Sequence, residues 1–483
     1  MNSKTQKISN INQEKESFLN INQQTFTELL TFIDFADERL NIGFVEIKFS
    51  QDRDILIDAL LEHPDCNNIQ FEILDFSDPS LRFLRDELVT ALKQINIQQN
   101  KKLILLITGL EKSIGIVEEY PSVLTNLNFV RDDLRTSIPH PILLFLPDYA
   151  LTRLAKYAPD FWAWRRKVFT FKTNRKNLIT NSRNIIFSNN TINNLDSQKK
   201  QARIEQLLNL LNEYNTSPDE KTKNDLLIIG NIYNQLGNTY QPLGQYQKAI
   251  IFHQQASEIS RKIGERGREA ISLSNLGIAY HALGQYQQAI IYYQQALEIY
   301  REIGNRQSEG NALGNLGTAY DSLGKHKKAI TYYQQALEIY RDIGNKQGEG
   351  NTLSNLGTAY DSLGEYQKAI TYYKQHLNIS REIGDKEGEG MSLCGLGNTY
   401  NFLRQHEEAI NYHQEALNIF KRTGNKLEEA ITNFNLGLSF KDIQRHDDAM
   451  EAFRNARKLY QDMGLDKCVE NCDDAINILE NHV

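Results

Sequence analysis

The sequence predicts a multidomain protein in which an N-terminal α/β domain with a parallel sheet precedes an all-α superhelical solenoid. The chain has 483 residues, more than one compact domain usually holds. Five short apolar runs alternate with helical patterns before residue 173, which is typical of a parallel α/β domain. From Asn231 onward the sequence repeats itself every 40 residues, which is typical of a stack of helical repeats.

The N-terminal part begins with a polar stretch. Residues 1–23 are rich in Asn, Gln, Ser and Lys, so we expect them to be disordered. A helical pattern follows from Thr25 and opens a domain that we place at 24–172. The runs that we expect to be strands are 42–49, 69–76, 103–108, 142–146 and 168–171. Helical patterns separate them near 54–62, 80–97, 117–135 and 149–157. The third and fourth runs are apolar, as expected of central strands buried on both faces.

A connecting region and six repeats make up the rest. Residues 173–200 are polar and Asn-rich and are predicted to be a linker. Two lead-in helices are expected within 201–230, near 201–214 and 220–230. The six copies span 231–270, 271–310, 311–350, 351–390, 391–430 and 431–470. Residues 471–483 are predicted to form a capping helix, because the end of a stack needs a polar outer face.

Each copy holds two helical patterns with small residues at fixed places. In the second copy, Leu276, Gly277 and Tyr280 lie on one face of the first helix. The second helix carries Ala, an aromatic residue and Ala at i, i+4 and i+7. The mid-helix glycine recurs in all six copies although it costs about 1 kcal/mol against Ala. This recurrence predicts a packing contact that leaves no room for a side chain. A second glycine, such as Gly284, lies between the helices and suits a left-handed terminator; Arg404 replaces it in copy five.

These residues resemble the tetratricopeptide repeat family over roughly 231–470. The usual repeat of that family is shorter and ends its second helix with a proline, which is missing here. The 40-residue version is similar to the long-helix repeats of kinesin light chains and cell-polarity adaptor proteins. His376 replaces an alanine and predicts a local packing change. His253 and His413 stand at the aromatic core position of their second helices, which favours a core role over metal binding.

The resemblance implies a peptide-binding groove lined by the first helices. The residue before each Leu-Gly pair would project into it, and the first row so defined is Gln235, Asn275, Asn315, Asn355 and Asn435. The next rows toward the end of each first helix are Thr318, Thr358 and Asn398, then Asp321 and Asp361. Carboxamides both donate and accept hydrogen bonds, so they could pair with the main chain of an extended peptide. The alternative is that these asparagines cap or brace neighbouring helices.

The α/β domain resembles the P-loop NTPase domains (STAND- or AAA-like) of bacterial signalling proteins. A P-loop needs glycines, a lysine and Ser/Thr to hold phosphates and magnesium. The segment after the first strand, FSQDRDILIDALLE (49–62), has none of this pattern. Only Glu111, after the third strand, could serve as a base. We therefore predict a degenerate, non-hydrolysing relative, and we expect no catalytic residue, cofactor or metal.

Bulk composition narrows the function classes. The formal charge of −7 argues against a mainly nucleic-acid-binding role. Four cysteines are too few for a disulfide framework. No apolar run is long enough for a membrane span and no secretory signal is visible, so we expect a cytoplasmic protein.

The sequence as a whole predicts an adaptor or scaffold that binds an extended peptide or a partner protein in the repeat groove. Self-association through the N-terminal domain would fit this role. The alternative is a nucleotide-dependent signalling switch that uses the repeats as its sensor.

Overall fold

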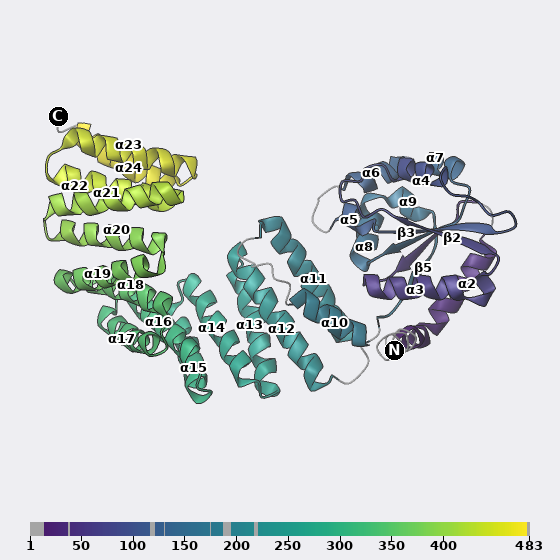
Figure 1. The fold of residues 1–483 in the computed structure, drawn as a ribbon, viewed down its shortest axis with the longest axis horizontal. Helices are drawn as coiled ribbons and strands as arrows, with labels where there is room; N and C mark the ends of the chain where they lie inside the picture. The colour runs from purple at the N-terminus through teal and green to yellow at the C-terminus, as the bar shows by residue number, and fades with distance from the viewer. Residues whose placement is uncertain are drawn as a thin grey trace. The chain divides into compact units, whose positions relative to one another are not determined.

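A computed structural model describes residues 14–36, 39–115, 121–129, 131–173, 175–186, 195–216 and 221–480. The chain divides into two compact units, Met1–Gln235 and Leu236–Val483. The first holds a sheet with its covering helices, and the second holds helices that follow one another in antiparallel pairs (Figure 1). The α/β and all-α halves predicted from the sequence are both present.

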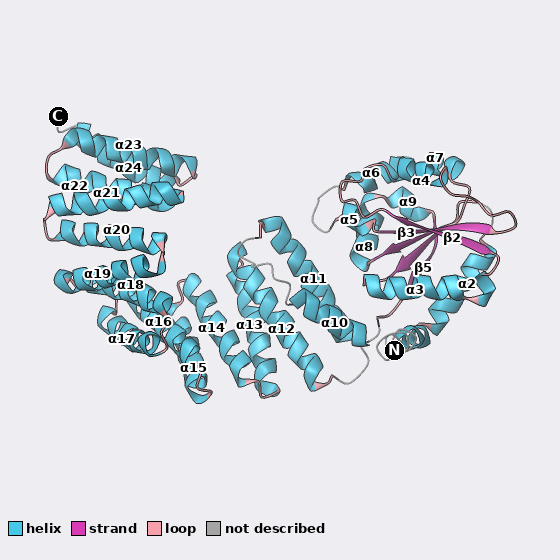
Figure 2. Ribbon diagram, viewed as in Figure 1, coloured by secondary structure: helices cyan, strands magenta, loops and turns pink. Residues whose placement is uncertain are grey.

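Five parallel strands form the sheet of the first unit (Figure 2). They are β1 (Ile42–Glu46), β2 (Ile69–Asp75), β3 (Lys102–Thr108), β4 (Ile142–Leu146) and β5 (Arg165–Thr170). Their spatial order is β2-β3-β4-β1-β5, and β1 pairs with β4 from Ile42 opposite Ile142. All five predicted strands are confirmed. The apolar strands β3 and β4 are central and almost fully buried, as their composition predicts.

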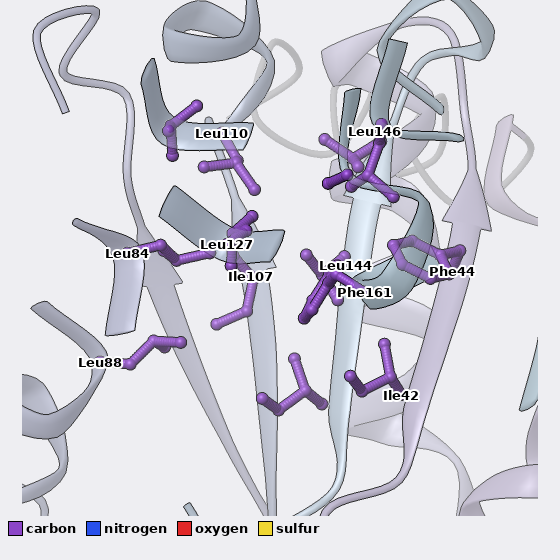
Figure 3. Packing of buried hydrophobic residues seen from close by; sticks show 14 of the residues in the cluster. Ile42, Phe44, Leu84, Leu88, Ile107, Leu110, Leu127, Leu144, Leu146 and Phe161 are labelled. Carbon is purple, nitrogen blue, oxygen red and sulfur yellow. The ribbon is translucent and has the colours of Figure 1, made fainter. Parts of the chain in front are cut away.

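Helices cover both faces of this sheet. One face carries α4 (Leu84–Leu92), α5 (Glu111–Ile114), α6 (Ser122–Phe129), α7 (Arg131–Ser137), α8 (Asp148–Tyr157) and α9 (Pro159–Ala163). Figure 3 shows part of this core, where Leu84, Leu127 and Phe161 close over the side chains of β1, β3 and β4. The opposite face is covered by α2 (Gln23–Phe35) and α3 (Ser50–Glu62). The result is a three-layer α/β/α unit.

The prediction of disorder over 1–23 is wrong for its second half. Residues 14–21 are helical, and the Phe18 ring is fully buried 6.0 Å from the Phe171 ring. Asn22 fixes the end of this helix, because its Nδ2 donates to the Lys172 carbonyl at 2.8 Å and its Oδ1 accepts from the Lys172 amide at 2.7 Å. One buried ring and one amide clamp thus order a segment of polar composition. Residues 1–13 lie outside the described residues.

The predicted linker at 173–200 is also partly wrong. It contains α10 (Arg175–Ile186) and the start of α11 (Ser197–Thr216). The Ser182 hydroxyl lies 3.1 Å from the Tyr214 hydroxyl in a buried contact between these two helices. Residues 187–194 lie outside the described residues. The polar composition hides this helix because only a few of its side chains, such as Leu178, are buried.

The repeats begin earlier than the sequence periods suggest. The second lead-in helix and the first helix of copy one form a single helix, α12 (Lys223–Tyr240). The later first helices are α14 (Arg266–Ala282), α16 (Arg306–Ser322), α18 (Lys346–Ser362), α20 (Lys386–Phe402) and α22 (Lys426–Asp442). The second helices are α13 (Tyr246–Lys262), α15 (Tyr286–Glu302), α17 (His326–Asp342), α19 (Tyr366–Ile383), α21 (His406–Thr423) and α23 (His446–Asp462). The expected cap is α24 (Asp466–Glu480), whose Cys472 and Leu479 are buried; residues 481–483 lie outside the described residues.

The recurring mid-helix glycines pack against aromatic rings. A Cβ built on Gly277 would lie 2.4 Å from Cε1 of Tyr293, closer than any real side chain allows. The same contact joins the other five glycines to His253, Tyr333, Tyr373, His413 and Phe453. This confirms the predicted contact and places both histidines in the aromatic core.

The glycines between the two helices of a repeat have left-handed backbones, with a φ of 73° at Gly284. Arg404 and Gln444 take the same conformation, with φ of 59° and 61°. A second left-handed glycine, such as Gly304 with a φ of 69°, ends each second helix where the family uses proline. These two turns per repeat set the antiparallel arrangement.

Candidate functional site

The candidate site is the surface formed by the first helices of the second unit. Successive first helices from α14 to α22 contact one another more extensively than successive second helices do. The first helices therefore form the tighter, inner wall of the stack. We call the exposed side of this wall the inner face; it contains all the predicted groove residues that lie from Asn275 onward.

The asparagine row divides into two kinds of residue. Asn275 Nδ2 donates to Asn238 Oδ1 at 3.1 Å, and Asn435 Nδ2 lies 3.9 Å from Cys394 Sγ, so these two brace neighbouring first helices. Within the described part of the chain, the carboxamides of Asn315 and Asn355 have no hydrogen-bond partner, and Asn355 is exposed. Gln235 is half-buried in α12. Only the middle of the row has carboxamides available to a ligand.

The row is interrupted where the helices come too close. Gly395 takes the place of asparagine in α20, and a Cβ there would lie 2.8 Å from Cε1 of Tyr373. An asparagine at this position would collide with the tyrosine ring. The interruption is therefore a consequence of packing, which the sequence alone does not show.

The threonines of the next row are committed to the repeats themselves. Thr318 Oγ1 donates to the Gly314 carbonyl at 3.1 Å and accepts from the Tyr333 hydroxyl at 3.2 Å. Thr358 makes the matching contact with the Tyr373 hydroxyl at 3.1 Å. Asn398, their counterpart in α20, is half-buried. These threonines hold the hydroxyls of the buried tyrosines. Their own hydroxyls therefore have less hydrogen-bonding capacity left for a ligand than their exposure suggests.

The two aspartates of the last row differ in environment. Asp321 Oδ1 lies 2.7 Å from His326 Nδ1 within the same repeat. Asp361 accepts a hydrogen bond from the Thr399 hydroxyl of the next repeat, at 2.8 Å to Oδ2. Burial raises the pKa of the Asp361 carboxyl to about 6, although the Thr399 hydroxyl opposes this rise. Asp361 is thus a link between two repeats.

Apolar side chains flank the polar middle of the inner face, which the sequence reasoning missed. Ile271 and Ile278 are 46% and 42% exposed on α14. On the other side Met391 is 49% exposed and Phe402 is 62% exposed on α20. Ile271, Ile278 and Met391 lie one turn before or after the asparagine row, and Phe402 lies two turns after it. This spacing is the signal that could have identified them. Exposed apolar side chains beside uncharged polar ones are a combination found at protein-binding surfaces.

A second candidate lies in the first unit, where the carboxyl ends of β1, β3 and β4 meet. Ligands of parallel sheets bind at this edge, between strands whose connections run to opposite sides. A cavity of about 270 Å³ opens there. Its charged and polar lining includes Lys48 and Ser50 after β1, Glu111 after β3, Asp148 after β4, and Glu213 from α11.

The charges of this cavity are largely paired with one another. Lys48 forms an ion pair with Glu213 and lies 3.9 Å from Asp148 Oδ2. Glu111 Oε1 lies 4.0 Å from Arg53 Nη1. Residues 47–49 connect β1 to α3 without a glycine, so no glycine-rich loop surrounds the amide groups that would bind a phosphate. The sequence-predicted Glu111 is therefore at the expected edge but lacks the surrounding phosphate site.

Two further classes of site are absent from the described residues. No group of His, Cys, Asp and Glu there has an arrangement that could hold a metal ion. No helix in that part of the chain is long and apolar enough to span a membrane.

Comparison with known proteins identifies a family only for the repeats. A family model described as the tetratricopeptide repeat matches residues 228–302, 280–342, 308–382 and 388–462. No curated protein matches the chain.

Similar solved structures include a signal transduction ATPase with numerous domains (STAND) that has a tetratricopeptide repeat sensor, from Pyrococcus horikoshii. It is 12% identical, with a TM-score of 0.43, over 94% of this chain and 95% of that one. Aspartyl phosphate phosphatase F from Bacillus subtilis is 16% identical, with a TM-score of 0.43, over 64% of this chain and 94% of its own. A Rap protein complexed with competence and sporulation factor is 14% identical, with a TM-score of 0.40, over 75% and 97%.

Proposed function

We propose that the chain, whose residues 228–382 and 388–462 match the tetratricopeptide repeat model, is a protein-interaction adaptor. Its inner face binds an extended peptide or an extended segment of a partner protein. The single observation that carries this proposal is the pair of unpartnered carboxamides, Asn315 and Asn355, at equivalent positions of adjacent first helices.

The pair suits the main chain of a peptide. Each carboxamide can donate to a peptide carbonyl and accept from a peptide amide at the same time. Such contacts read the backbone whatever the side chains of the peptide are. Specificity would come from the flanking apolar residues Ile278 and Phe402, which offer surfaces for apolar side chains of the ligand.

The polar middle of the inner face carries no full charge apart from Asp321 and Asp361. Asp321 is paired with His326, and Asp361 is half-buried with a raised pKa. A clamp for a carboxylate would need Lys or Arg on the inner face. The asparagine row and the threonine row contain neither residue. The proposed ligand is therefore an internal or extended segment with apolar anchors, rather than an acidic C-terminal tail.

A peptide library displayed on phage and selected on the full chain tests this proposal. The selected peptides should bind Asn315→Ala/Asn355→Ala about ten-fold or more weakly, because two neutral hydrogen bonds are each worth about 1 kcal/mol. The matched control is Asn411→Ala/Asn418→Ala, which removes two exposed asparagines from the second helix α21. Equal binding of a selected peptide to both double variants, or failure to enrich any peptide, would contradict the proposal.

The first unit is proposed to act as a non-hydrolysing regulatory or docking module. The ion pair between Lys48 and Glu213 supports this role, because it occupies the sheet edge where a nucleotide would otherwise bind. The first unit also exposes the apolar side chains of Phe35 and Phe129, which are candidates for a self-association surface. Sedimentation of the full chain beside Phe129→Ser tests that part of the proposal.

A further inference from the structure

A second cavity lies at the opposite edge of the sheet, where the strands begin. It has a volume of about 420 Å³ and is formed within the first unit. Arg39 and Asn41 precede β1, Arg135 lies on α7, and Trp164 and Arg166 lie where β5 starts. Neither the peptide-binding proposal nor the nucleotide edge of the sheet uses these residues.

Three guanidinium groups line this cavity without a partner among the residues that the structure describes. Arg39, Arg135 and Arg166 are exposed, and none has an ion pair or hydrogen bond from its guanidinium to another described residue. No acidic side chain is among the described residues that line the cavity. Arg85 of the same unit, by contrast, forms an ion pair with Asp86 at 2.9 Å. Three like charges around one hollow repel each other, and a bound anion would relieve that repulsion.

The cavity is also lined by an aromatic side chain. Trp164 is partly buried, and its indole packs against the core beneath the sheet edge while it lines the hollow. The backbone of Arg39 is held locally, because its carbonyl accepts from the buried Asn41 Nδ2 at 3.4 Å. The lining of the cavity thus combines an aromatic side chain with three guanidinium groups.

We propose that this cavity binds a small-molecule phosphate monoester that carries a planar ring, such as a nucleoside monophosphate. The phosphate would lie among the three guanidinium groups, since three arginines offer more paired donors than a carboxylate can accept. The ring would lie against Trp164. A nucleic acid is disfavoured, because the chain carries a formal charge of −7 and the arginines surround one hollow instead of forming a stripe.

The test is calorimetric titration of AMP, without magnesium, into the full chain. Saturable binding is expected, and it should weaken as salt is raised. Arg135→Gln should bind AMP about ten-fold more weakly, because a charge-assisted hydrogen bond is lost. Arg82→Gln is the matched control: Arg82 is an exposed arginine of the same unit outside the cavity, so it should leave the affinity unchanged.

Two further measurements separate the contribution of the phosphate to the affinity from that of the ring. Ribose 5-phosphate and adenosine should each bind more weakly than AMP, and Trp164→Leu should bring AMP down to the affinity of ribose 5-phosphate. The chain has only two tryptophans, Trp162 and Trp164, so quenching of intrinsic fluorescence gives an independent readout at the cavity. Circular dichroism of each variant establishes that it is folded.

The proposal is overturned if AMP does not bind at millimolar concentration, or if Arg135→Gln and Arg82→Gln bind it equally. It is also overturned if a single-stranded oligonucleotide without a terminal phosphate binds as tightly as AMP. That last result would mean that the arginines recognise a nucleic-acid backbone.

Discussion

His413 shows how a single residue can depart from its repeat. It occupies the core position that tyrosine fills in three other copies, and its imidazole is fully buried beside Gly397. The hydroxyls of Tyr333 and Tyr373 contact Thr318 and Thr358, but neither ring nitrogen of His413 has a hydrogen-bond partner among the described residues. The sequence predicts the core position from its spacing. It cannot predict the missing partner, because that depends on distances.

This environment makes the stability of the protein depend on pH. Burial lowers the pKa of His413 to about 4, whereas an unfolded histidine titrates near 6.5. The unfolded chain therefore takes up a proton first, so the contribution of His413 is intact above about pH 6.5 and is lost as the pH falls toward 4. The loss amounts to up to about 3 kcal/mol at pH 4.

Replacing the histidine with the residue used in copy six should remove that dependence. His413→Phe mimics Phe453, which makes the same contact with Gly437. We expect the variant to be more stable than the natural protein at neutral pH by about 1–3 kcal/mol, since two unpartnered polar atoms are removed. The difference should grow toward pH 4. Urea unfolding at several pH values measures this, and a difference that stays constant with pH would contradict the pKa argument.

At the scale of the element, spacing identifies the helices but not their ends. The Leu-Gly and Ala-aromatic-Ala patterns place both helices of every repeat correctly. The repeat frame is shifted because residues such as Arg306 and Glu309, which lie at the end of a sequence period, form the first turn of α16. There the exposed Asn305 caps the helix, and the buried Glu309 is held by Arg301 at 2.9 Å and Arg306 at 2.6 Å. The spacing of apolar residues cannot predict a helix start whose first turn is made of charged residues.

Two glycines of α16 test the packing argument at this scale. Gly317→Ala should destabilise the protein by about 1–3 kcal/mol, because the new Cβ would lie 2.4 Å from the Tyr333 ring. Gly314→Ala, three residues earlier, meets nothing within 4 Å and should stabilise it by up to about 1 kcal/mol. Thermal unfolding of the two variants compares them directly. If both variants change stability in the same direction, helix propensity, and not the close packing of the two helices, explains the effect of replacing Gly317.

At the scale of the whole molecule, the division into an α/β half and a repeat half follows from the sequence, and so do all five strands. The strand order does not follow, because it is set by long-range pairing that local patterns do not encode. The helices at 14–21 and 175–186 were missed because single buried side chains, such as Phe18, hold polar segments in place. For the inner face, the sequence predicts the rows of residues. It does not predict which of these side chains are already hydrogen-bonded to a neighbouring repeat.

A prediction for the first unit distinguishes a non-hydrolysing regulatory or docking module from a nucleotide-dependent switch. A magnesium-dependent nucleotide site at the carboxyl edge would need amide groups after β1 and a free lysine, yet Lys48 is held by Glu213 and lies near Asp148. We therefore expect no magnesium-dependent binding when ATP is titrated into Arg135→Gln, the variant that weakens binding at the arginine-lined cavity of the other edge. Glu111→Gln in the same background should change nothing. Magnesium-dependent binding or hydrolysis that Glu111→Gln abolishes would instead favour a nucleotide switch, because Glu111 is the acid that follows β3 at this edge.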